Sequence, residues 1–230
     1  MSLIAASDQD TLRTLFDERL QGDVTITYFT QHESKLIVPG QECALCAQTR
    51  EILQEVAELS DKVHLEVKDF VRDAEAVKEL GVDRIPAFVL AGRAQGKVRY
   101  FGIPSGYEFS SLIEDLLDVS TGTTDLSEKT RKALAAIDQD VHIQVFVTPT
   151  CPYCPLAARL AHKLAIENPH ITADAIEATE FPELVQRYNI FGVPKTIIND
   201  RVEEEGALRE PQFMQQVLGA LDGNSPSTQA

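Results

Sequence analysis

The stretch VFVTPTCPYCPLAARLAHKLAIEN, from Val145 to Asn168, begins with apolar residues that suit a strand and continues with apolar residues at helical spacing. Two cysteines, Cys151 and Cys154, stand where one pattern gives way to the other. A cysteine at such a junction lies beside free backbone N–H groups and the positive end of a helix dipole, which favour its thiolate form. The second sulfur lies about one helical turn further on, close enough to attack a mixed disulfide formed by the first. The stretch therefore predicts a redox dithiol with Cys151 as nucleophile and Cys154 as resolving thiol.

A second copy of this motif occurs earlier in the chain, at Cys43 and Cys46, which precede the later cysteines by 108 residues. Each copy is followed by a proline 43 residues after its first cysteine, and these are Pro86 and Pro194. A single pair of this kind is a weak signal, whereas two pairs in matched surroundings are hard to explain by packing. We therefore expect an internal duplication, with Cys43 and Cys46 as a second nucleophile and resolving pair.

Both halves show the same order of predicted elements around their cysteines. A helix and a strand precede each pair, and a helix, a strand, a short helix, two further strands and a closing helix follow it. The strands before the pairs are predicted at Val24–Thr30 and Val141–Val147, and the first half carries nine additional residues between strand and cysteines. This order predicts an α/β protein of two tandem units, each a mixed central sheet flanked by helices.

The boundary between the units is predicted in residues 120–125, which are rich in serine, threonine and glycine. We expect an N-terminal unit over residues 1–120 and a C-terminal unit over residues 121–222. Residues 223–230 are small and polar, which predicts a disordered tail.

Composition bounds the class of protein. The chain has 230 residues, of which 43% are hydrophobic, enough for a proper core. Its formal net charge of −15 argues against binding to nucleic acid or to an anionic membrane. The first residues lack the basic and apolar regions of a signal peptide, and no apolar run approaches a membrane span, so we expect a cytoplasmic protein. In a reducing compartment, four cysteines in two close pairs favour catalysis or metal binding over structural disulfides.

The two repeated prolines predict a substrate-binding feature. A cis peptide bond at Ile85–Pro86 and at Val193–Pro194 would leave the backbone of the preceding residue free to hold a peptide beside the cysteines. Trans prolines that merely begin a strand are the alternative. The equal spacing from both cysteine pairs favours cis, and we expect Pro152 and Tyr153, between the later cysteines, to contact substrate as well.

A zinc-binding or scaffold module that uses all four thiolates is the alternative function. Short zinc modules separate their cysteine pairs by about 15 to 20 residues. Here 104 residues separate Cys46 from Cys151, so zinc would require the two halves to fold face to face. The five histidines show no ligand spacing with a cysteine pair, and we assign them no role. The prediction is therefore an enzyme without metal or other cofactor.

The sequence resembles the protein disulfide oxidoreductases, two-unit relatives of glutaredoxin and thioredoxin known chiefly from archaea and thermophilic bacteria. The segments that carry the resemblance are RYFGIPSGYEF at residues 99–109, IDQDV at residues 137–141 and VFVTPTCPYCP at residues 145–155. The resemblance implies two thioredoxin folds joined edge to edge, cis prolines at Pro86 and Pro194, and dithiol–disulfide exchange with protein substrates. Some members of this family are reduced by an NADPH-dependent thioredoxin reductase, which is therefore a candidate partner.

The N-terminal motif departs from the family pattern, because Cys43-Ala44-Leu45-Cys46 lacks the aromatic residue usual beside the second cysteine. A similar two-unit arrangement with one working pair occurs in the N-terminal domain of alkyl hydroperoxide reductase flavoproteins, which is a weaker match. Glutathione is a less convincing partner than protein. Glutaredoxins follow their proline strand with a Gly-Gly turn and an acidic residue, whereas residues 198–207 here contain one glycine.

Overall fold

The computed structural model describes residues 3–31 and 43–221. The predicted tail at residues 223–230 and most of the enlargement before Cys43 lie outside these ranges. Within them, no helix combines the length and the apolar character needed to cross a membrane. The first half contains α1 (Ala6–Arg19), β1 (Val24–Thr30), α2 (Cys46–Ala57), β2 (Val63–Asp69), α3 (Ala74–Leu80), β3 (Ala87–Ala91), β4 (Lys97–Phe101) and α4 (Tyr107–Thr121).

The second half repeats this order of elements. It contains α5 (Glu128–Leu134), β5 (Val141–Val147), α6 (Cys154–Glu167), β6 (Ile171–Glu177), α7 (Pro182–Arg187), β7 (Lys195–Ile198), β8 (Val202–Glu205) and α8 (Glu210–Leu221). Helix α4 ends inside the predicted boundary region. The exact division at residue 120 stays a prediction.

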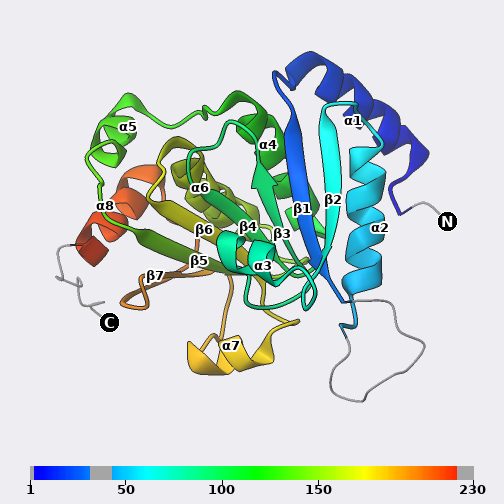
Figure 1. Cartoon of the computed structure of the whole chain (residues 1–230). Helices are drawn as coiled ribbons and strands as arrows, with labels where there is room; N and C mark the ends of the chain where they lie inside the picture. Colours follow the sequence, from blue (N-terminus) through cyan, green and yellow to red (C-terminus); the bar gives the residue numbers. More distant parts are fainter. Residues whose placement is uncertain (1–2, 32–42, 222–230) are drawn as a thin grey trace.

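The strands form one eight-stranded sheet in the order β2-β1-β3-β4-β6-β5-β7-β8 (Figure 1). In each half the central strand pairs in parallel with one neighbour and antiparallel with the other, and a hairpin completes the unit. Strand β4 of the first half pairs in parallel with β6 of the second. The predicted α/β fold of two thioredoxin-like units joined edge to edge is confirmed.

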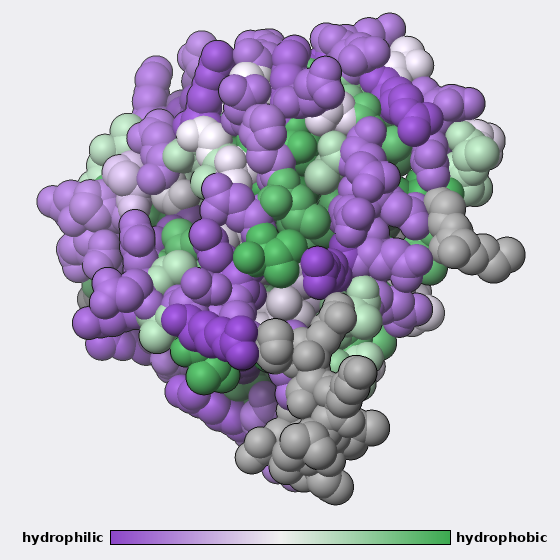
Figure 2. Space-filling model, turned by 45° about the vertical axis from the view of Figure 1, so that its right-hand side comes forward, coloured by the Kyte–Doolittle hydropathy of each residue, from purple (hydrophilic) through white to green (hydrophobic). Residues whose placement is uncertain are grey.

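Alternation along the strands divides the core into two layers. Val141, Ile143 and Val145 of β5 face a large cluster that includes residues of α1, α2, α4, α5, α6 and α8, whereas Phe146 faces a smaller cluster with α3 and α7. The outer surface seen in Figure 2 is mainly hydrophilic, with an apolar area near the centre of that view. The helices therefore cover both faces of the sheet, as the order of elements predicts.

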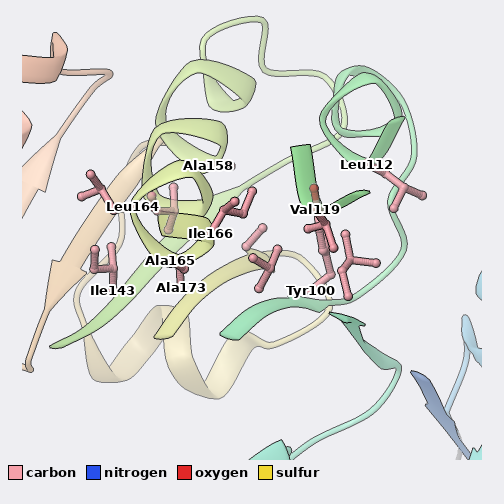
Figure 3. Packing of buried hydrophobic residues seen from close by; sticks show 14 of the residues in the cluster. Tyr100, Leu112, Val119, Ile143, Ala158, Leu164, Ala165, Ile166 and Ala173 are labelled. Atoms are coloured by element: carbon pink, nitrogen blue, oxygen red, sulfur yellow. The ribbon is translucent and has the colours of Figure 1, made fainter. Parts of the chain in front are cut away.

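Helix α6 packs closely on the sheet because much of its buried face is alanine. Ala158 and Ala165 are fully buried, and they lie with Leu164 over Ile143 and Ala173 of the strands below (Figure 3). Alanine also has the highest helix propensity, and proline in the first turn fits a helix start. This packing places Cys154, the first residue of α6, at the end of β5.

A buried ion pair joins the two halves of the sheet. Arg99 of β4 and Asp174 of β6 are directly opposite in the strand register, and Arg99 donates to both carboxylate oxygens, at 2.7 and 2.9 Å. The His142 Nε2 atom lies 2.6 Å from the same carboxylate. Burial acts to raise the pKa of Asp174, but His142 and the charge of Arg99 outweigh it and lower the pKa overall. The junction is thus fixed by a satisfied charge cluster as well as by backbone pairing.

Candidate active site

The C-terminal cysteine pair lies where β5 ends and α6 begins. The Cys151 N–H donates to the Thr148 carbonyl at 3.2 Å, which closes a tight turn after the strand. Both cysteines are free thiols, and they differ in access, since 9% of Cys151 is exposed and none of Cys154. Cys151 is thus the more accessible of two buried thiols, and its role as nucleophile, with Cys154 as resolving partner, stays a prediction.

The predicted proline segment lies beside Cys151. Both Ile85–Pro86 and Val193–Pro194 are cis, as the sequence analysis predicts. The Val193 carbonyl oxygen is 3.6 Å from Cys151 Sγ and accepts a weak hydrogen bond from it. Val193 is half-buried, whereas Pro152 and Tyr153 are exposed. The structure thus brings together Cys151, Cys154 and Val193, with Tyr153 at their edge.

The buried thiol needs a proton acceptor before it can react. Burial raises the pKa of Cys154 well above its usual range, and the hydrogen bond with Cys151 and the negative charge of Glu108 add to the rise. Because only a thiolate attacks a disulfide, Cys154 has to lose its proton at the moment of attack.

Glu108 is a functional candidate that the sequence analysis missed. It lies in the first turn of α4 and is 2% exposed, and neither carboxyl oxygen has a hydrogen-bond partner of good geometry in the described part of the chain. Burial raises its pKa to about 7, although the Ser111 hydroxyl opposes part of the rise. A buried carboxyl group with this pKa, whose charge acts on Cys154, can accept a proton near neutral pH.

The approach of α4 to the later redox site depends on the backbone before it. The Tyr107 N–H donates to the Pro149 carbonyl at 3.0 Å. Gly106 has a φ of 61°, and a Cβ atom there would lie 2.2 Å from the same carbonyl oxygen. Only glycine fits this contact, which fixes the start of α4, where Glu108 lies, against the segment before Cys151. The structure thus places a buried acid, Glu108, within residues 99–109, one of the segments that carry the family resemblance.

A buried polar cluster lies behind Glu108, between α4 and α6. The Asp115 carboxylate accepts hydrogen bonds from Tyr100 and Arg159, and its Oδ2 atom lies 2.6 Å from His162 Nδ1. Burial lowers the pKa of His162 to about 3, so the ring is neutral and Nδ1–H donates to Asp115. His162 thus belongs, in its neutral form, to the buried polar cluster between α4 and α6.

The N-terminal cysteines form a disulfide, Cys43–Cys46, with a Cα–Cα distance of 5.4 Å. Gln31 Oε1 accepts from the Cys43 N–H at 2.8 Å, and the Tyr28 hydroxyl donates to the Cys46 carbonyl at 2.7 Å. Tyr28 occupies the position in β1 that Val145 occupies in β5. In the described residues no hydrogen bond joins Ile85 to either cysteine. The two redox motifs therefore share their backbone course and differ in the side chains around them.

A metal site is not assembled by the described residues, among which no group of three or more cysteine, histidine or acidic side chains is gathered for an ion. The zinc alternative thus has no structural observation in its favour.

Comparison with known proteins agrees with this geometry. The family model described as a thioredoxin domain matches residues 34–114 and, a second time, residues 141–219. The chain belongs to the thioredoxin domain family. A protein disulfide oxidoreductase from Aeropyrum pernix is 29% identical, with a TM-score of 0.85 over 96% of this chain and 95% of that one. The predicted resemblance is confirmed.

Relatives of a second kind share the two-unit fold. The crystal structure of the NTD_N/C domain of alkylhydroperoxide reductase AhpF from Enterococcus faecalis is 23% identical, with a TM-score of 0.81 over 93% of this chain and 99% of that one. The corresponding alkyl hydroperoxide reductase protein from Escherichia coli is 30% identical over 176 residues, which are 76% of this chain and 32% of that protein. The chain thus spans about a third of the length of the curated relatives it matches. Thiol–disulfide chemistry is supported as the class of reaction.

Proposed function

We propose that the chain is a protein dithiol–disulfide oxidoreductase whose principal site is Cys151 and Cys154. The observation that carries the proposal is the arrangement of this site: Cys151 Sγ lies beside the Val193 carbonyl, Cys154 is fully buried, and the charge of the buried Glu108 acts on Cys154. Cys43 and Cys46 form a second redox pair, which the structure holds as a disulfide.

The first step uses Cys151, the more accessible of the two thiols. The Cys151 thiolate attacks one sulfur of a substrate disulfide, a Cys151–substrate bond forms, and the other substrate sulfur leaves as a thiolate that takes a proton from solvent. The cis Val193–Pro194 bond and the position of Val193 beside Cys151 support the proposal that the substrate chain lies along this segment during the attack.

The second step uses the buried thiol. Cys154 gives its proton to Glu108, and its thiolate attacks Cys151 Sγ, so that a Cys151–Cys154 disulfide forms and the substrate leaves as a thiolate. The proton held by Glu108 then returns to this leaving thiolate or to water. Two electrons have moved from the protein dithiol to the substrate disulfide, and the reverse sequence oxidises a substrate dithiol.

A protein substrate suits the surroundings of Cys151 better than glutathione does. Tyr153 is 65% exposed, Leu156 63% and Phe191 92%, and we call these three side chains the apolar rim. Exposed apolar side chains around a reactive group favour an extended protein surface over a small charged tripeptide. The net charge of −15 also disfavours an anionic ligand.

The reductant and the compartment follow from the same chemistry. We propose that a separate dithiol donor reduces the cysteine pairs, and a thioredoxin reductase is the candidate that the family resemblance implies. The cytoplasm, where closely spaced cysteine pairs work as catalysts, is the compartment we propose.

Reduction of insulin disulfides, with dithiothreitol as electron donor, tests the proposal. We expect Cys151→Ser to lose most of the catalysed rate because the attacking sulfur is gone. Thr150→Ser changes the exposed neighbouring residue and serves as the matched control, with the parent rate expected. Full activity in the Cys151→Ser protein would remove Cys151 from the principal role.

A further inference from the structure

A groove between the two cysteine motifs is lined by residues of both units. Its volume is about 430 Å³. Leu45, which lies between Cys43 and Cys46, lines the groove from the first unit, and Pro149, two residues before Cys151, lines it from the second. The groove therefore joins the surroundings of the two redox pairs.

The C-terminal pair lies within a short reach of this groove. Two residues of extended chain span at most about 7 Å, which bounds the distance from the Pro149 Cα atom to the Cys151 Cα atom. The turn closed by the Cys151 N–H and the Thr148 carbonyl makes the actual path shorter. A substrate chain that is held at Cys151 can therefore enter the groove within about two to four of its own residues.

The lining of the groove is mainly apolar. Leu3, Leu45, Ile52, Ile103 and Pro149 supply most of it. Leu3 is 43% exposed, so apolar surface in the groove stays available to a ligand. Of the described residues that line the groove, none is basic and only Glu177 is acidic. The groove thus suits apolar side chains and offers no counter-charge to an anionic ligand.

The acidic lining residue is engaged within its own connection, between β6 and α7. The Glu177 carboxylate accepts a hydrogen bond from the Thr179 hydroxyl at 2.6 Å. It also accepts from the backbone N–H groups of Thr179 and Glu180, at 3.2 and 2.8 Å. Glu177 is buried, so these bonds satisfy its carboxylate and shape the wall of the groove without a charged ligand.

Hydrogen bonds from side chains to backbone hold both walls of the groove in place. In the first unit, the Glu55 carboxylate accepts from the N–H groups of Leu3 and Ile4, at 2.7 and 2.9 Å. Across the junction of the units, Glu180 Oε1 accepts from the Ile103 N–H at 2.6 Å. A groove that is already formed has few groups left to order when a chain binds, which lowers the free-energy cost of binding.

Exposed apolar surface continues from the groove along the C-terminal motif. The Tyr107 N–H donates to the Pro149 carbonyl at 3.0 Å, so the backbone of Tyr107 lies against a lining residue, and its side chain is exposed. Tyr153 of the apolar rim lies two residues beyond Cys151. A chain that follows this surface meets apolar side chains both at the groove and at the rim.

We propose that the groove binds apolar side chains of a protein substrate that stand about two to four positions from the cysteine under attack. The site therefore prefers extended or unfolded segments in which apolar residues flank the disulfide, because a folded protein buries most such residues. The proposal rests on the proposed exchange reaction at Cys151 and names the class of substrate that this site takes.

Two synthetic peptides test the preference. Each has one central cysteine and forms a symmetric disulfide, and the positions about two to four residues from the cysteine are leucine in one peptide and serine in the other. The full chain catalyses their reduction, with dithiothreitol as electron donor. We expect kcat/KM for the leucine peptide to exceed that for the serine peptide roughly 10-fold, as burial of one leucine side chain would give.

A first variant removes apolar surface from the groove. Leu3→Ser should lower the ratio of the two kcat/KM values by about threefold, because part of the surface that a bound leucine contacts is lost. Leu218→Ser is the matched control, since Leu218 is 36% exposed and lies outside the groove lining, and it should keep the parent ratio. Each ratio compares two peptides on one protein, so a general effect on the redox centre cancels.

A second variant adds charge to the groove. Gln48 is an exposed residue of α2 that lines the groove, and Gln48→Glu places a hydrated carboxylate where a bound leucine would remove water. We expect this variant to lower the ratio as well. Gln54→Glu makes the same change at an exposed position of the same helix outside the lining, and it should keep the parent ratio.

The outcomes distinguish this proposal from the one it rests on. Equal kcat/KM values for the two peptides on the parent chain would overturn the role of the groove while leaving the exchange reaction intact. A preference for leucine that Leu3→Ser and Gln48→Glu keep as fully as their controls would also overturn it. A parent chain that reduces neither peptide would overturn the proposed function, and the role of the groove with it.

Discussion

At the scale of single residues, the later redox site combines a buried thiol with a buried carboxyl group whose charge raises the pKa of that thiol. Cys154 and Glu108 come from different helices and from different halves of the chain. Burial raises the pKa of both groups, so only the ionised Glu108 carboxylate can accept the Cys154 proton, and the transfer moves one negative charge without creating a second. The same burial that prepares Glu108 for proton transfer makes its ionised form costly to the fold.

Because ionised Glu108 is unfavourable in the folded protein, we expect the Glu108→Gln variant to be more stable than the parent at high pH. The folded-state pKa of about 7 exceeds the ordinary value of 4.5, so the folded protein retains a proton that the unfolded chain has lost. The contribution of protonated Glu108 to the free energy of unfolding is complete below about pH 4.5 and is lost as the pH rises through about 7. Above pH 7 we expect Glu108→Gln to raise the free energy of unfolding by at most about 3 kcal/mol.

Urea unfolding of the parent and of Glu108→Gln at acid and alkaline pH tests whether the variant is the more stable protein at high pH. The two proteins should have nearly equal midpoints at acid pH and separate as the pH rises. A variant less stable than the parent at alkaline pH would show that the Glu108 carboxylate is stabilised in the fold.

At the scale of elements, helix α6 carries both the redox motif and a large part of the core. Its apolar residues recur at helical spacing, which the sequence reveals directly. Its first residue is Cys154, so any shift of the helix on the sheet moves the buried thiol. Packing of this helix is thus coupled to the geometry of the site.

Truncation of a core residue of α6 predicts a large loss of stability. Leu164 is 1% exposed, and Leu164→Ala leaves a cavity that should lower the free energy of unfolding by about 2–5 kcal/mol. Leu218→Ala, in the more exposed part of α8, should lower it by less than about 1 kcal/mol. Calorimetric unfolding of the two variants provides the comparison, and equal losses would mean that α6 is less tightly packed than the structure shows.

Elements whose signal is local are predictable from the sequence. The strands Val24–Thr30 and Val141–Val147 have the predicted bounds, and both X-Pro bonds are cis. Glu108 was missed because its partner, Cys154, is distant in the chain, and nothing in the helical pattern of α4 marks one acid as buried. The contact of Tyr28 with the N-terminal cysteine pair was missed as well. The Tyr28 hydroxyl bonds the backbone carbonyl of Cys46, and no pattern of side chains in the sequence predicts a bond to backbone.

At the scale of the whole molecule, the strands of the two units form one continuous sheet. The order of elements predicts two units, and the family resemblance implies their edge-to-edge joining. The pairing of β4 with β6 and the ion pair between Arg99 and Asp174 depend on contacts across 75 residues, which no local pattern could specify. Helix α4 of the first unit, which carries Glu108, contacts α6 of the second unit only because this junction joins the two units.

Loss of one partner at the junction predicts strong destabilisation. Asp174→Asn leaves Arg99 buried without its counter-charge and should lower the free energy of unfolding by about 3–5 kcal/mol at neutral pH. Because the pKa of Asp174 is lowered in the folded protein, the stabilisation by ionised Asp174 is lost as the pH falls below the ordinary carboxyl range. The difference in free energy of unfolding between parent and Asp174→Asn should therefore become smaller in acid.

The exposed acid Asp140, next to His170, provides the control for this variant. Asp140→Asn should leave the midpoint of urea unfolding unchanged, because surface ion pairs contribute little. Equal effects of the two substitutions would show that the ion pair at the junction is no more than a surface contact.

The central claim, that Cys151 attacks protein disulfides and Cys154 resolves them, is tested most directly by trapping the mixed disulfide. A Cys154→Ser protein, reduced and then incubated with insulin, cannot complete the second step. Peptide mass spectrometry after acid quenching should find insulin linked to Cys151. Insulin linked only to Cys43, or to neither cysteine, would contradict the account.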